Sequence, residues 1–151
     1  MTGFPGGVVV EADNLDFVLP GGRDSRDGVQ GGGILIWHID EGRLVEGLNT
    51  NSVNADAGRR AVDLEEADGA QDLGYPSRSF FGPSFDAGSP FDFFYSGNPT
   101  VVVTPTGSEV RLYDNRFGPD TYPNSGSNAG GSSFVELVDF SAPGPEMSFV
   151  Y

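Results

Sequence analysis

The chain has 151 residues, a formal net charge of −14 and no cysteine, and all eight of its basic residues are arginine. The length fits one domain, the acidity excludes nucleic acid and anionic membranes as partners, and the lack of cysteine excludes disulfides, thiolate zinc sites and cysteine nucleophiles. Its 23 glycines and 11 prolines disfavour long helices, whereas a 12% aromatic content argues against plain disorder. We therefore expect a single packed β domain over residues 1–151.

Short apolar runs separated by turn-forming residues follow one another along the whole chain and predict its strands. The runs lie at residues 8–10, 17–19, 34–39, 62–65, 100–104, 111–113, 134–140 and 147–151. A short helical turn over 64–67 is the alternative for the end of the fourth run. The pattern predicts an all-β fold, a β-sandwich or jelly-roll-like arrangement with long loops rich in glycine, proline and asparagine.

The strongest strand signal is the run at 34–39. Because side chains alternate across a strand, Trp37 and Ile39 lie on one face and Ile36 and His38 on the other. Both faces are apolar as far as His38, which predicts a central strand covered on both sides. A polar loop should follow it. The stretch 69–98 also reads as a loop, and we expect its phenylalanines to pin it to the sheets.

His38 is the only histidine, and it limits the catalytic chemistry that the chain can carry. A zinc protease helix of the H-E-x-x-H type needs two histidines, and a serine hydrolase of the G-x-S-x-G type needs an elbow that the sequence lacks. The acidic pairs 40–41 and 65–66 could suggest the two carboxylates of a glycosidase, but such pairs are common in a chain this acidic. We expect no catalytic residue and no zinc, and a structural His38 that hydrogen-bonds a carboxylate or a backbone carbonyl.

Calcium is the cofactor that the acidic loops favour, because it takes six to eight hard oxygen ligands in flexible geometry. Two loops, Asn54-x-Asp56-x-Gly58 and Asp24-x-x-Asp27-Gly28, have only part of a calcium-loop pattern. The densest group of carboxylates follows them, and neighbouring Arg59 and Arg60 offer an alternative source of charge balance. The predicted calcium ligands are Asp40, Asp63, Glu65, Glu66 and Asp68.

Two segments of this sequence together resemble a known family. The first reads G-I-L-I-W-H-I-D-E over 33–41, and the second reads A-V-D-L-E-E-A-D-G over 61–69. They are similar to the paired signature of the immune inhibitor A-type secreted metalloproteases, in the β-rich segment that follows the zinc-binding core. The end of the chain, with P-N-S at 123–125 and the runs at 134–140 and 147–150, is similar to the closing strands of that family.

The resemblance implies an extracellular protein, secreted or at the cell surface. Many members of the family are stabilised by calcium. The zinc motif of their protease domain has no counterpart in this sequence. No signal peptide is visible in residues 1–7 and no run approaches the ~20 apolar residues of a membrane helix. We therefore expect a module of a larger secreted protein, without membrane insertion. Its partner would be the protease domain of the same parent. The alternative is an extracellular structural subunit whose copies associate into a filament or surface layer.

Overall fold

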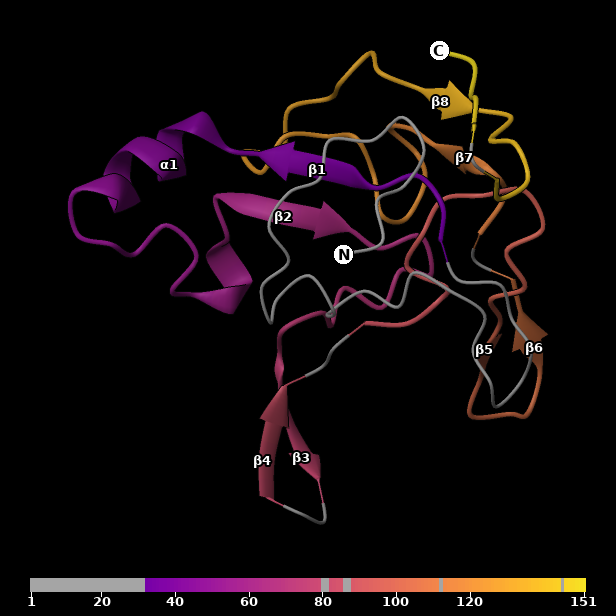
Figure 1. Ribbon diagram of the computed structural model, residues 1–151, viewed down its shortest axis with the longest axis horizontal. Helices are drawn as coiled ribbons and strands as arrows, with labels where there is room; N and C mark the ends of the chain where they lie inside the picture. Colours follow the sequence, from indigo (N-terminus) through magenta and orange to yellow (C-terminus); the bar gives the residue numbers. More distant parts are fainter. Residues whose placement is uncertain (1–31, 80–81, 86–87, 112, 145) are drawn as a thin grey trace, which may run out of the picture.

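The computed structural model describes residues 32–79, 82–85, 88–111, 113–144 and 146–151. Within these residues the chain is rich in short strands and long loops, with one α-helix and one 3₁₀ turn (Figure 1). The elements in chain order are β1 (Ile36–Ile39), α1 (Glu41–Leu48), η1 (Ala57–Arg59), β2 (Val62–Glu65), β3 (Pro76–Ser79), β4 (Gly82–Phe85), β5 (Val102–Val103), β6 (Glu109–Val110), β7 (Arg116–Phe117) and β8 (Leu137–Val138). None of the helices in this part of the chain is long and apolar enough to cross a membrane.

The described strands pair antiparallel in four two-stranded sheets, β1–β2, β3–β4, β5–β6 and β7–β8. In the longest-range pairing, Ile36 lies opposite Glu65 and Ile39 opposite Val62. The β3–β4 hairpin extends away from the rest of the chain, whereas β1–β2 and β7–β8 lie together in the body of the molecule (Figure 1). The prediction of a β-rich fold is confirmed.

An aromatic core holds these sheets together. The ring of Phe94 contacts Tyr113 and Phe117 edge-on, with centroids 6.0 and 5.6 Å apart, and lies 5.3 Å from the ring of Phe140. Ile36 of β1 and Leu137 of β8 pack against the same cluster. Edge-to-face pairs of this kind add to the free energy gained by burying the rings. Two sheets distant in sequence therefore share one core.

The loop that carries Phe94 is fixed to Ile34, just before β1. Ile34 and Phe94 exchange two backbone hydrogen bonds of 3.0 Å. The preceding Gly33 permits this approach, because a Cβ there would lie 2.6 Å from the Cβ of Phe93. Phe93, Phe94 and Tyr95 are all buried. The prediction that phenylalanines pin the 69–98 stretch is confirmed for Phe94. The prediction that this stretch is a loop throughout is wrong, because β3 and β4 form a hairpin within it.

The prediction that the strand at 34–39 is covered on both faces is wrong. Trp37 and Ile39 are 55% and 56% exposed, while Ile36 and His38 on the other face are half-buried. The physical reason is that β1 pairs only with β2 among the described strands, and only its inner face meets the aromatic core. The run of apolar residues therefore gives β1 one buried face and one apolar exposed face.

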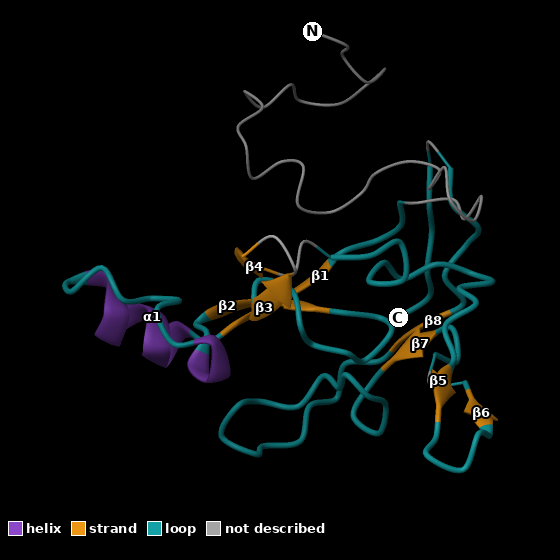
Figure 2. Ribbon diagram, turned by 90° about the horizontal axis from the view of Figure 1, so that it is seen from below, coloured by secondary structure: helices purple, strands orange, loops and turns teal. Residues whose placement is uncertain are grey.

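The helix α1 replaces the first part of the expected polar loop, which makes the all-β prediction too strict. Asp40 caps it by accepting a hydrogen bond from the Arg43 amide at 3.0 Å, and the helix-forming residues Glu41, Leu44 and Leu48 extend it. Figure 2 shows α1 extending beyond β1 and β2 at one end of the molecule.

The other expected strands are shorter or displaced. No helical turn forms over 64–67, where β2 runs to Glu65. Instead of the strand expected at 111–113, the chain forms β6 just before it. The turn at 104–107 places Val103 opposite Glu109, so the residues that pair with β5 are Glu109 and Val110. The two terminal runs contribute β8 and a bridge between Val138 and Val150. The runs at 8–10 and 17–19 and the loop with Asp24 and Asp27 lie outside the described residues.

Candidate metal centre

Three carboxylates from two segments meet beside the aromatic core. Oxygens of Glu66, Asp68 and Asp92 all lie within 4.8 Å of one another. Glu66 directly follows β2, and the amide of Ala67 donates to the carbonyl of Asp92 at 3.0 Å, which joins the two segments. Glu66 and Asp92 are 0% and 1% exposed, and Asp68 is half-buried. We call these three residues the acidic cluster.

Backbone amides fix each carboxylate of the cluster. Glu66 accepts hydrogen bonds from the amides of Asp72 and Leu73, at 2.8 Å on Oε2 and 2.9 Å on Oε1. Asp92 accepts from both the amide and the hydroxyl of Ser89, at 2.6 and 2.7 Å. A carboxylate has about four lone-pair sites, so each group keeps acceptor capacity beyond these bonds. The chain thus presents preoriented oxygens.

The turn that carries Asp68 is equally defined. Asp68 accepts a hydrogen bond of 2.9 Å from the amide of Ala70. Gly69 adopts a φ of +76°, which favours glycine, and its amide donates to the carbonyl of Glu66 at 2.8 Å. A cavity of about 320 Å³ borders Asp68 and Gly69 and is walled by Phe91 and Val101. Of the three acids, only Asp68 borders this cavity.

Burial makes ionisation of the cluster unfavourable. Burial, assisted by the negative charge of Asp68, raises the pKa of Glu66 to about 7 and that of Asp92 to about 6, although their hydrogen bonds act in the opposite direction. None of the ion pairs within the described ranges involves a residue of the cluster. The group therefore needs either protons or a cation at neutral pH.

The ligands of the acidic cluster suit a hard divalent cation. All three side chains offer carboxylate oxygens, the ligand type of calcium, whereas zinc sites use mainly histidine and cysteine. The cluster is the one group of three potential metal ligands among the described residues. Three carboxylates would leave the remaining coordination positions to backbone carbonyls or water. The chemistry of the residues present thus fits the calcium that the sequence predicts.

The structure divides the five predicted ligands into two groups. Glu66 and Asp68 enter the acidic cluster, whereas Asp40, Asp63 and Glu65 each lie with a basic side chain. Asp63 accepts a hydrogen bond from Arg60 at 2.9 Å, and Glu65 lies 3.1 Å from Nδ1 of His38. Alternation along β2 explains the division, because Asp63 and Glu65 share one side of the strand while the next residue, Glu66, faces the other.

Asp40 caps the N-terminus of α1. It accepts hydrogen bonds from the amide of Arg43 and from the side chain of Asn128, both at 3.0 Å, and it lies 3.4 Å from the Arg43 guanidinium. The hydrogen bonds from Arg43 and Asn128 hold the pKa of Asp40 below its usual value. Glu65, by contrast, has its pKa raised by burial, with an opposing effect from His38. The expectation that His38 bonds a carboxylate is confirmed.

The Asn54 loop is also structural. The Asn54 amide oxygen accepts from the backbone amides of Ala61 and Val62, and its nitrogen donates to the carbonyl of Val62 at 2.8 Å. Asp56 accepts from the amide of Gly58 at 3.0 Å at the start of η1. Both side chains thus hold the loop in place before β2.

Asp92 is the member of the acidic cluster that sequence reasoning missed. It lies 26 positions after Glu66, as a lone acid between Phe91 and Phe93. A charged residue in an aromatic run is seldom buried without a compensating partner, and that pattern is the signal that could have singled it out.

No family model, curated protein or solved structure matches the chain.

Proposed function

We propose that this chain is a non-catalytic, calcium-stabilised extracellular β module of a secreted metalloprotease-like protein. The observation that carries the proposal is the acidic cluster, in which Glu66 and Asp92 are fully buried and carry no ion pair within the described ranges. Burying carboxylates costs free energy that a bound cation offsets. A calcium ion bound there would neutralise most of that charge.

An ion at the acidic cluster would also act as a cross-link. Glu66 holds the loop up to Leu73, and Asp92 holds the turn that begins at Ser89. A backbone hydrogen bond from Ala67 to Asp92 joins the two segments directly. Calcium would therefore restrain loops that have little regular structure. The role is structural, as in modules that fold more stably with metal.

The rest of the proposal concerns architecture and partner. β1 and β7–β8 pack on the same aromatic core, which supports a β-sandwich or jelly-roll-like arrangement in the complete domain. The exposed side chains of Trp37 and Ile39 on β1, with Val45 and Leu48 on α1, support packing against the protease domain of the parent. The absence of a zinc motif and of a serine elbow in the sequence supports a non-catalytic role.

Thermal unfolding in calcium and in EGTA tests the proposal. A cation at about 100 times its Kd would stabilise the fold by about 2.7 kcal/mol, which raises the melting temperature by about 5–10 °C. Asp92→Asn should remove this difference. Asp40→Asn is the matched control, because Asn also caps helices, and it should leave the difference intact. Equal melting of the wild-type protein in both buffers would refute calcium stabilisation.

A self-assembling extracellular subunit is the second candidate function. It is favoured by a group of exposed apolar side chains that precede β8 or lie at the end of the given sequence, namely Phe134, Val135, Phe149, Val150 and Tyr151. Such a surface suits association between copies through strand edges. The mass of the native protein separates the two candidates. Large assemblies of a chain near 15.9 kDa support the subunit, and a much heavier single polypeptide supports the module.

A further inference from the structure

The helix α1 turns most of its apolar side chains to solvent. Glu41, Val45 and Leu48 are spaced four and three residues apart, so they share one face of the helix. Val45 and Leu48 are 67% and 60% exposed, Glu41 is exposed as well, and the third apolar side chain, Leu44, is half-buried. Figure 2 shows α1 at one end of the molecule. We call Glu41, Val45 and Leu48 the outer face of α1.

The inner side of α1 is held by polar contacts and by a glycine. Arg43 donates to the carbonyl of Arg60 at 3.4 Å and lies 3.4 Å from Asp40. Gly47 is buried, and a Cβ there would lie 2.7 Å from the backbone of Val53. A surface helix usually turns its apolar stripe to the core and its charged side to water. On α1 a charged side chain faces the body of the chain and two of three apolar side chains face away from it.

The strand before α1 has an exposed apolar side too. β1 ends at Ile39, one residue before the cap of the helix. Trp37 and Ile39 on its outer side are both more than half exposed. Large apolar side chains that gather on the surface mark sites of protein contact. Two consecutive elements therefore offer apolar side chains to a partner.

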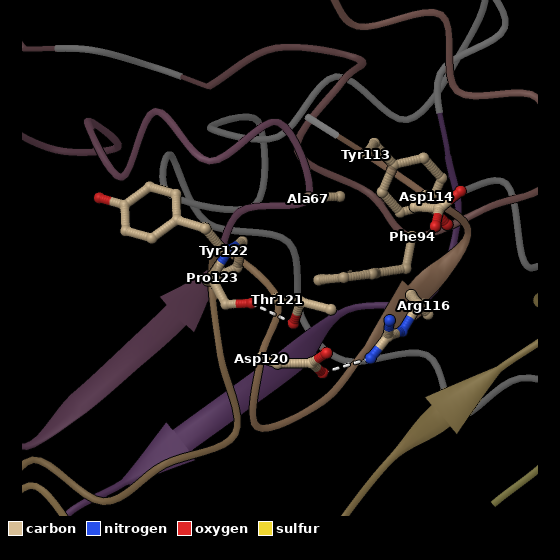
Figure 3. Close-up of a pocket in the computed structure, with 9 residues that line it drawn as sticks. All are labelled: Ala67, Phe94, Tyr113, Asp114, Arg116, Asp120, Thr121, Tyr122 and Pro123. Carbon is tan, nitrogen blue, oxygen red and sulfur yellow. Dashed lines mark hydrogen bonds and ion pairs between the residues drawn. The ribbon is translucent and has the colours of Figure 1, made fainter. Parts of the chain in front are cut away.

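The charge of the outer face favours a basic partner. Glu41 makes no hydrogen bond or ion pair with the described residues. Asp120, by contrast, is paired with Arg116, as Figure 3 shows, and Glu136 lies 3.0 Å from the same guanidinium. Complementary charges steer association and fix its register. The carboxylate of Glu41, beside two apolar side chains, thus suits an arginine or lysine across an interface.

A second copy of the chain fits the outer face poorly. Each copy would bring a net charge of −14 and its own Glu41, so two such faces would repel each other. Two turns of helix also bury much less than the ~800 Å² per partner of a standard interface. The helix therefore suits the role of an anchor within a wider contact, to which the outer side of β1 contributes.

We propose that α1 anchors the module to the protease domain of its parent, with Val45 and Leu48 in an apolar groove whose rim carries a basic side chain facing Glu41. Helices that bind in grooves use anchors spaced in this way along one face. The inference deepens the proposed function and rests on it, because the groove belongs to the parent. It does not depend on calcium, since none of its residues lies in the acidic cluster.

Hydroxyl-radical footprinting compares the native polypeptide, isolated from its source, with the 151-residue chain alone. Mass spectrometry measures the oxidation of each side chain. We expect Val45 and Leu48 to be oxidised at least about threefold more slowly in the native polypeptide, because the core of an interface excludes water. Val110 is the matched control, since it is 42% exposed on β6, at the opposite side of the molecule from α1 in Figure 1. Its oxidation should be equal in both samples.

Glu41→Lys in the native polypeptide tests the basic rim. The substitution places like charges together, so the oxidation of Val45 should return close to its rate in the chain alone. Glu41→Gln removes the attraction without adding repulsion and should give an intermediate rate. Glu109→Lys is the control, because Glu109 is exposed on β6, and it should leave the protection intact.

Equal oxidation of Val45 and Leu48 in a heavier native polypeptide and in the chain alone would overturn the inference and leave the module proposal standing. Slow oxidation in both samples would mean that another part of the same chain covers α1, and would overturn it too. Protection that survives Glu41→Lys would exclude the basic rim. A native polypeptide near 15.9 kDa would overturn the inference together with the parent module, so its mass distinguishes the two failures.

Discussion

The acidic side chains on the two sides of β2 differ in their partners and their burial. Asp63 and Glu65 face one side, where Arg60 and His38 lie within 3.1 Å of their oxygens. Glu66, one residue further, faces the other side and is buried beside Asp92 and the half-buried Asp68, and none of the three has an ion pair within the described ranges. Acidic density along a sequence therefore does not define a metal site. What distinguishes the acidic cluster is burial without a basic partner.

The largest expected effect comes from removing the central carboxylate of the cluster. Glu66→Ala leaves the amides of Asp72 and Leu73 without acceptors and should lower the free energy of unfolding by about 2–4 kcal/mol. Glu65→Ala, on the other side of the strand, removes only the contact with His38 and should cost less. Urea denaturation of both variants in calcium measures the difference. Equal losses would contradict the distinction between the two sides.

The dependence of stability on pH should reverse between the two buffers. In EGTA the folded state holds protons on Glu66 up to about pH 7 and on Asp92 up to about pH 6, whereas the unfolded chain loses them near their ordinary values. The folded state then binds more protons, so the contribution of these groups is full at low pH and is lost as pH rises through about 6 and 7.

In calcium the trend should be opposite, because the ion needs ionised carboxylates. The measurement is the melting temperature of the wild-type protein minus that of Asp92→Asn, taken at about pH 5 and about pH 8 in both buffers. The difference should fall with pH in EGTA and rise with pH in calcium. The same slope in both would show that no cation binds at the acidic cluster.

A smaller effect is expected at the helix cap. Asp40→Ala removes the acceptor for the Arg43 amide and should lower the melting temperature by about 2–4 °C. The loss should be equal in calcium and in EGTA, since Asp40 lies with Arg43 and Asn128 and not in the cluster. A loss confined to the calcium buffer would identify Asp40 as a ligand.

The smallest effect is expected for Asp63→Asn. The ion pair with Arg60 is partly exposed to solvent, and such pairs contribute about 0–1 kcal/mol. Arg60 also donates to the carbonyl of Leu73 and lies over the ring of Tyr75, so it keeps other contacts. Chemical denaturation should show a change within this range. A change as large as that of Glu66→Ala would mean that the paired side also depends on a cation.

Local patterns predicted much of the fold. Alternation and β-branching located β1 and β2, and the aromatic run located the buried loop at Phe93 and Phe94. The exposed face of β1 was not predictable, because an apolar side chain such as Trp37 gives no sign of whether another layer covers it. The helix α1 was missed because eight residues with three apolar side chains give a weak period.

The candidate site was predictable only in part. Glu66 and Asp68 follow a recognisable strand, so their neighbourhood was expected to bind calcium. Asp92 joins them through a hydrogen bond between backbone atoms of Ala67 and Asp92, which lie 25 positions apart on either side of the β3–β4 hairpin, and no local pattern predicts such a contact. The partners of Asp63 and Glu65 depend on strand register, which sequence alone does not fix.

Calorimetric titration of calcium into metal-free protein tests the central claim most directly. The account predicts one ion per chain, with protons released on binding because Glu66 and Asp92 must ionise. Binding should be lost in Asp92→Asn and retained in Asp63→Asn. Absence of calcium binding by the wild-type protein, or binding that survives in a folded Asp92→Asn, would contradict a metal site at Glu66, Asp68 and Asp92.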